Sequence, residues 1–299
     1  MKKIVFIFLT IMSFLHASKP ELSVSILPQK YFLEKIVKDK YEINVMVKPG
    51  ASPHTYEPKS SQMKSLVASK VYFYTGVSFE QVWLDKFKQS AKDTVFVDST
   101  DGIEKMEMAK HEHHDENEKN SDAKNHDHEN EHEEHDHSGL DPHVWLDPNL
   151  VKIQAKNIYE TMVKVDSVNA DFYKTNYEEF LKEIDALDEN IKTILEPYKE
   201  KAFMVFHPSW GYFAKRYNLE EISIEIEGKE PKPAELVELM DEAKKHNIKI
   251  IFSSPQFSQK SALAISKNIQ ATVISIDPLA QNWSENLLNS AKQIANSYK

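Results

Sequence analysis

Three histidines stand at positions where a parallel sheet would bring them together. His54 follows a predicted strand at residues 41–47, His207 follows another at residues 202–206, and His143 belongs to the motif Asp-Pro-His-Val-Trp-Leu-Asp-Pro. Ligands of open α/β sheets bind at the carboxyl ends of the strands, so we expect the three imidazoles to share one site. Imidazole nitrogens suit a borderline-soft cation such as Zn²⁺. A single histidine at a strand end is more often a hydrogen-bonded structural residue. A metal site is favoured here because three histidines share this kind of position.

Asp277 has a similar position, because it ends a predicted strand at residues 272–276 and precedes a proline. Alone, such an aspartate is commonly a turn or capping residue. Beside three imidazoles, we interpret it as a fourth ligand that closes a tetrahedron. His246 lies near a predicted helix end and fits the structural interpretation instead. The predicted metal ligands are therefore His54, His143, His207 and Asp277.

The elements that must position these residues are short apolar strands alternating with helical patterns. We expect strands at residues 22–27, 41–47, 71–74, 95–97, 202–206, 222–226, 248–252 and 272–276. We expect helices at residues 31–37, 60–69, 234–246, 258–268 and 284–297. Such alternation is typical of parallel sheets with covering helices. The predicted fold class is α/β, with two lobes of parallel sheet joined by one long rigid helix.

The joining helix is predicted by apolar residues that recur at spacings of four and three from Tyr173 to Ile194, ending before Pro197. A coiled-coil seam is the alternative, but a helix packed across two α/β halves is favoured. The expected division is a signal peptide at 1–17, a first lobe at 18–165, a linking helix at 166–197 and a second lobe at 198–299.

The N-terminus and the composition indicate an exported chain. Lys2 and Lys3 precede an apolar stretch and a small residue, Ala17, so we expect a secretory signal cleaved near Ala17 rather than a membrane anchor. The chain has no cysteine, which excludes disulfides, thiol nucleophiles and a lipidated N-terminal cysteine. We therefore expect a periplasmic protein without a lipid anchor. No Lys/Arg run resembles a nucleic-acid footprint, so no nucleic-acid partner is expected.

Residues 110–137 differ in composition from the rest of the chain, because they contain eight histidines, eleven acidic residues and three lysines. Such a segment buries too little apolar surface to fold alone, so we expect a disordered loop that collects zinc. A solvated acidic tract with incidental metal affinity is the alternative. The loop contains His128-Glu-Asn-Glu-His132, which matches the zinc-protease pattern HExxH. That pattern needs a stable helix, and its low-complexity context predicts none.

Several motifs together resemble the periplasmic zinc-binding proteins of metal ABC importers, the ZnuA type. The resemblance is carried by residues 49–58, 141–148, 207–217, 227–231 and 277–279. It implies two lobes joined by a long helix, with Zn²⁺ held at their interface by His54, His143, His207 and Asp277. Some zinc-binding members have Glu where this chain has Pro53, and manganese-type relatives tend to have Glu where it has His207.

The resemblance implies a non-enzymatic, monomeric protein that captures Zn²⁺ and delivers it to the membrane permease of a metal ABC importer. Two other functions remain as alternatives. A periplasmic zinc buffer or chaperone without a transporter would share every motif. A zinc hydrolase would need an open coordination position, and a fourth ligand at Asp277 would close the site.

Overall fold

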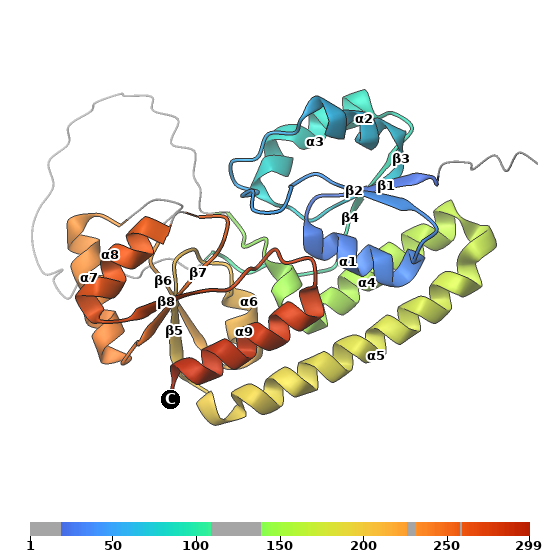
Figure 1. Cartoon of the computed structure of the whole chain (residues 1–299). Helices are drawn as coiled ribbons and strands as arrows, with labels where there is room; N and C mark the ends of the chain where they lie inside the picture. Colours follow the sequence, from blue (N-terminus) through green and yellow to red (C-terminus); the bar gives the residue numbers. More distant parts are fainter. Residues whose placement is uncertain (1–18, 109–138, 226–230, 258) are drawn as a thin grey trace, which may run out of the picture.

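The fold consists of two α/β lobes that share one long helix (Figure 1). The computed structural model describes residues 19–108, 139–225, 231–257 and 259–299. Within them, each lobe is built on a four-stranded sheet in which every paired strand runs parallel to its neighbour. The predicted fold class is therefore confirmed. The predicted signal peptide, and all of residues 110–137, lie outside the described residues.

The two sheets repeat the same topology. The first has the order β2-β1-β3-β4 and the second has the order β6-β5-β7-β8. The first sheet is formed by β1 (Glu21–Val24), β2 (Glu42–Val45), β3 (Ser69–Tyr74) and β4 (Val95–Asp98). The second is formed by β5 (Ala202–Val205), β6 (Glu220–Ser223), β7 (Ile250–Ser253) and β8 (Thr272–Ser275). In both sheets the carboxyl ends of the strands lie at one edge, where loops can bring side chains together.

Helices cover the sheets and connect the lobes. The first lobe carries α1 (Leu27–Val37), α2 (Ser60–Ala68), α3 (Ser78–Ser90) and α4 (Pro148–Val165). The second carries α6 (Gly211–Arg216), α7 (Pro233–Lys245), α8 (Gln259–Ile269) and α9 (Trp283–Ser297). The long helix α5 (Ala170–Leu195) contacts α1 and α4 on one side and α9 on the other, so it runs along both lobes (Figure 1). None of the described helices is long and apolar enough to cross a membrane.

Apolar periodicity explains why α5 joins the lobes. Tyr173, Phe180, Ile184 and Ile191 are each at most 1% exposed, and their spacing places them on one face of the helix. They belong to a core that also includes α9 residues such as Leu287. This shared core favours a stiff connection, because separating the lobes from α5 would expose its apolar face.

The second sheet is buried on both faces, as expected for parallel strands covered by helices. Along β5, Phe203 and Val205 belong to the core shared with α5, whereas Ala202 and Met204 belong to a separate apolar cluster. That separate cluster also includes Leu239 of α7. Because both layers hold β5 in place, the residues that follow it have fixed positions.

Several predicted boundaries differ from the structure. The strand predicted at residues 22–27 ends at Val24, because Pro28 fits the first turn of α1 and Gln29 Oε1 accepts hydrogen bonds from the N–H groups of Ser25 and Ile26. Helices α3, α4 and α6 lie outside the helix ranges predicted from the sequence. Part of the strand predicted at 222–226 lies outside the described residues, and β6 begins earlier, at Glu220.

Candidate metal centre

His54 lies in the loop after β2 and is oriented by the first lobe. Its backbone N–H donates to the Ser52 hydroxyl at 3.2 Å. Its ring Nδ1 lies 2.9 Å from the hydroxyl of Ser78, the first residue of α3. The Ser78 contact occupies Nδ1 and leaves Nε2 available to a metal.

His143 is fixed by an acid two residues before it. Asp141 Oδ1 accepts a hydrogen bond from the His143 backbone N–H at 2.9 Å and lies 2.7 Å from its ring Nδ1. Because the acceptor is a carboxylate, Nδ1 carries the proton and Nε2 has the free lone pair. The Tyr212 hydroxyl of α6 donates to the Asp141 carbonyl at 2.9 Å, so the second lobe also holds this segment.

His207 follows β5 and is held by an acid that follows the neighbouring strand β6. Its Nδ1 lies 2.5 Å from Oε2 of Glu225. The His207 side chain is 6% exposed and that of Glu225 is 9% exposed. Nε2 of His207 is buried and has no hydrogen-bond partner among the described residues. A buried polar atom without a partner is costly, and a metal ion would satisfy this one.

The structure brings the three predicted histidines into one group. Each offers a ring nitrogen, and the three nitrogens lie within 4.8 Å of one another. The ring centroids of His54 and His207 are 4.7 Å apart, and those of His143 and His207 are 5.7 Å apart. Each Nδ1 already has a partner, so the arrangement of hydrogen bonds presents three Nε2 atoms. A carboxylate that holds the second nitrogen, as Asp141 and Glu225 do here, is typical of histidines that bind metals.

Burial keeps the imidazoles of His54 and His207 neutral. Burial lowers the pKa of His54 to about 3, and the nearby rings of His207 and His143 add to this effect. Burial also lowers the pKa of His207, although its hydrogen bond with Glu225 acts in the opposite direction. Both rings are therefore unprotonated at neutral pH, which is the form that binds metal ions.

The space between the imidazoles is small and mostly apolar. The cavity has a volume of about 10 Å³. Apart from the histidines, it is lined by Pro53, Val77, Pro142, Trp145, Ser209, Gln256, Phe257, Pro278 and Leu279. The Phe257 ring is stacked on His207, with centroids 4.3 Å apart and planes inclined by 25°.

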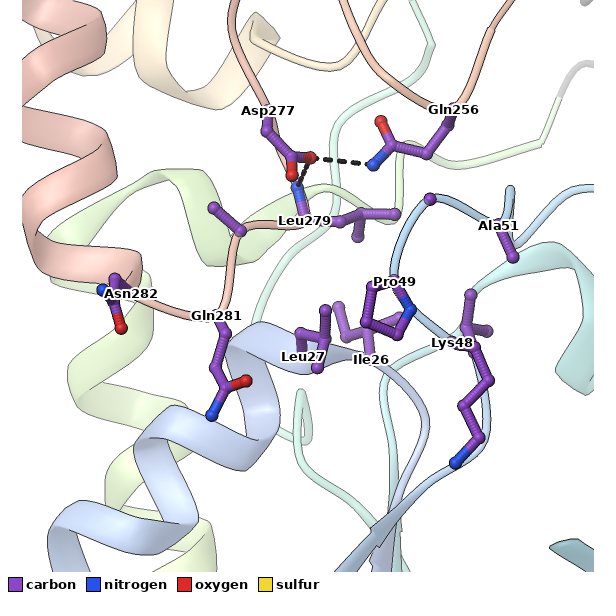
Figure 2. A pocket seen from close by; sticks show the side chains of 13 residues that line it. Ile26, Leu27, Lys48, Pro49, Ala51, Gln256, Asp277, Leu279, Gln281 and Asn282 are labelled. Atoms are coloured by element: carbon purple, nitrogen blue, oxygen red, sulfur yellow. Dashed lines mark hydrogen bonds between the residues drawn. The ribbon is translucent and has the colours of Figure 1, made fainter.

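Asp277 lies outside this group. It lines a separate cavity of about 460 Å³ between the lobes (Figure 2). Its Oδ1 accepts hydrogen bonds from Gln256 Nε2 at 2.8 Å and from the Leu279 N–H at 2.9 Å. Gln256 and Leu279 border both cavities, so they separate Asp277 from the histidines. The structure thus brings three of the four predicted ligands together, and the assignment of Asp277 stays a prediction.

Hydrogen bonds from two tryptophans connect the segment that contains His143 with the segment that contains Asp277. Trp145 Nε1 donates to the Pro278 carbonyl at 2.7 Å, and Trp283 Nε1 donates to the Trp145 carbonyl at 2.6 Å. Both indoles are at most 2% exposed. The candidate metal centre is therefore built across the boundary between the lobes.

The groups that orient and cover the histidines were not predicted from the sequence. Asp141 lies within the motif that contains His143, and the repeated strand-end pattern could have identified Glu225 after β6. Ser78, Gln256 and Phe257 gave no comparable signal, because they reach the site from loops and helix starts.

Comparison with known proteins gives consistent matches. Residues 23–297 match the family described as zinc-uptake complex component A, periplasmic (ZnuA). The high-affinity zinc uptake system protein ZnuA of Bacillus subtilis (strain 168) is 32% identical over 248 residues, covering 82% of this chain and 73% of that protein.

Two crystal structures are also similar. A structure of ZnuA is 40% identical, with a TM-score of 0.82, and the match covers 95% of this chain and 100% of that one. A zinc-bound ZnuA that lacks residues 138–173 of its own sequence is 40% identical, with a TM-score of 0.81, and that match covers 94% and 98%. The chain therefore belongs to the ZnuA family, the periplasmic zinc-binding solute-binding proteins of ABC importers, whose transported ligand is zinc.

Proposed function

We propose that the chain captures Zn²⁺ outside the inner membrane with the Nε2 atoms of His54, His143 and His207. The observation that carries this assignment is the buried Nε2 of His207, which has no hydrogen-bond partner among the described residues and lies in a group of three ring nitrogens. Two neutral rings with lowered pKa values support the same assignment. Three nitrogen donors favour Zn²⁺ over the harder Mn²⁺.

Asp277 is the proposed fourth ligand. It would have to leave its hydrogen bonds with Gln256 and Leu279, and water is the competing fourth ligand. With Asp277 bound, all four positions of a tetrahedral ion would come from the protein, which is typical of non-catalytic zinc sites. Membership of a solute-binding family supports a carrier without enzymatic activity. We extend this proposal to delivery of the ion to the permease of an ABC importer, after removal of a signal peptide near Ala17.

The site assignment is tested by zinc titration of the full chain against a chelator of known affinity. We expect one tight site in the unmodified chain, and its loss in His143→Ala. His246→Ala is the matched control, because His246 directly follows α7 and contacts Glu242 at 3.3 Å instead of the histidine group. An unchanged tight site in His143→Ala would show that the assignment is wrong.

The transporter assignment needs a separate experiment. A zinc buffer would bind the ion equally well but would not stimulate a transporter. We expect the zinc-loaded chain to stimulate ATP hydrolysis by the importer of the same cell, reconstituted in liposomes, and His143→Ala to fail to do so. Tight zinc binding without such stimulation would favour the buffer.

A further inference from the structure

The wall around the three imidazoles is mostly apolar and leaves little space between them. Val77 is 2% exposed, Trp145 1% and Leu279 7%, and these side chains line the histidine cavity together with Phe257. The cavity volume of about 10 Å³ is close to the minimum that holds a single water molecule. Beyond the three ring nitrogens, the site therefore has room for about one more ligand atom.

This limit matters because metal ions differ in the number of ligands they require. Zn²⁺ is commonly tetrahedral with nitrogen, sulfur or carboxylate ligands, whereas Mn²⁺ favours an octahedral set of oxygens. An octahedral ion held by three imidazoles needs three additional ligands, and a cavity of about 10–15 Å³ holds only one water molecule. The cavity of about 10 Å³ is too small for three such ligands.

We propose that Phe257 limits the coordination number of the bound ion and thereby selects Zn²⁺ over ions that require six ligands. This inference rests on the proposed function, because it concerns the same three histidines. The Phe257 ring is stacked on His207 at 4.3 Å and its centroid lies 6.3 Å from that of His54. It therefore covers the space beside two of the three imidazoles.

Phe257 is also the part of the wall that can be changed with the least damage to the fold. It lies in the loop between β7 and α8 and is only half-buried. Trp145, in contrast, is fully buried and makes hydrogen bonds to both Pro278 and Trp283. Shortening Phe257 should open the cavity while leaving the hydrogen bonds of the histidines in place.

Phe257→Ala and Phe257→Leu form a matched pair for the test, because leucine keeps most of the apolar bulk and alanine does not. The probe is Co²⁺, whose visible absorption is strong in tetrahedral sites and weak in octahedral ones. Spectra are recorded on the full chain with less than one equivalent of Co²⁺. The spectrum of His143→Ala measures the absorption of Co²⁺ bound outside the histidine site. Thermal unfolding of each metal-free variant shows whether that variant is folded.

We expect strong tetrahedral bands for the unmodified chain and for Phe257→Leu. Phe257→Ala should show the weak bands of a higher coordination number, and its affinity for Mn²⁺ relative to Zn²⁺ should rise about tenfold, equivalent to about 1.4 kcal/mol. Val77→Ala opens the same cavity from the first lobe and should change the spectrum in the same direction.

An unchanged cobalt spectrum and an unchanged ratio of Mn²⁺ to Zn²⁺ affinities in Phe257→Ala would overturn the proposal. Equal changes in the alanine and leucine variants would also overturn it, since the size of the side chain at position 257 would then not determine the coordination number. Failure of the proposed function has a different signature. In that case, His143→Ala would have the same cobalt spectrum as the unmodified chain.

Discussion

The hydrogen bond between Glu225 and His207 should set much of the zinc affinity. Glu225 Oε2 lies 2.5 Å from His207 Nδ1, and both side chains are at most 9% exposed. A hydrogen bond to a charged group contributes about 1.5–3 kcal/mol, and it fixes both the tautomer and the direction of the ring. The negative charge also makes the imidazole a better donor to a cation.

Two substitutions separate these effects. In Glu225→Gln an amide oxygen can still accept the hydrogen bond, but the charge is lost, and neutral hydrogen bonds have about half the strength of charged ones. We therefore expect about tenfold weaker zinc binding. In Glu225→Ala the whole hydrogen bond is lost, and the expected weakening is about a hundredfold, at the upper end for groups that orient metal ligands.

The assay is zinc competition with a chelator, performed on the full chain at constant pH. Glu220→Gln is the matched control, because Glu220 is the first residue of β6, the strand that Glu225 follows. Its side chain is 55% exposed and lies 4.0 Å from His246 instead of the histidine group. The control should keep the affinity of the unmodified chain. Zinc binding by Glu225→Ala that is as tight as in the unmodified chain would refute this role of Glu225. Equal weakening of Glu225→Gln and Glu220→Gln would also refute it.

Four further outcomes are expected. Zinc should raise the thermal midpoint of the unmodified chain, by a stabilisation of about 4 kcal/mol at a thousandfold excess over Kd, and calorimetry should find a smaller rise for His143→Ala. The folded-state pKa of Glu221 is raised to about 8 by burial, so the folded chain binds more protons than the unfolded chain above pH 4.5. The free energy of unfolding should consequently fall as pH rises towards 8, and urea titrations should show a weaker fall for Glu221→Gln. Deleting residues 110–137, which lie outside the described part, should remove weak zinc sites and keep one tight site in equilibrium dialysis; loss of the tight site would place a primary ligand in that segment. Asp277→Asn should weaken zinc binding in chelator competition if the carboxylate is the fourth ligand, and an unchanged affinity would favour water.

The fold and the histidine group could be predicted because both depend on local patterns. Strand-end positions indicated His54 and His207, because ligands of parallel sheets bind beyond the carboxyl ends of the strands. The two histidines follow strands of different sheets, so their meeting depends on how the lobes pack. The spacing of Tyr173 to Ile194, another local pattern, indicated the long helix. Phe257 and Gln256 could not be predicted in this way, since their contacts depend on the path of a loop and on side-chain directions that have no period in the sequence.

Asp277 illustrates the difference between a predicted position and a predicted contact. The sequence places it correctly after β8, but the direction of its carboxylate is decided by Gln256 Nε2 and the Leu279 N–H. Exchanging these hydrogen bonds for a metal would cost about 1.5–3 kcal/mol for each bond lost. A nanomolar zinc site corresponds to about 12 kcal/mol, so the cost is a fraction of the total. The observed direction of the Asp277 carboxylate therefore agrees with a fourth ligand that joins the histidines only when the ion arrives. Gln256 would then compete with the ion for this carboxylate.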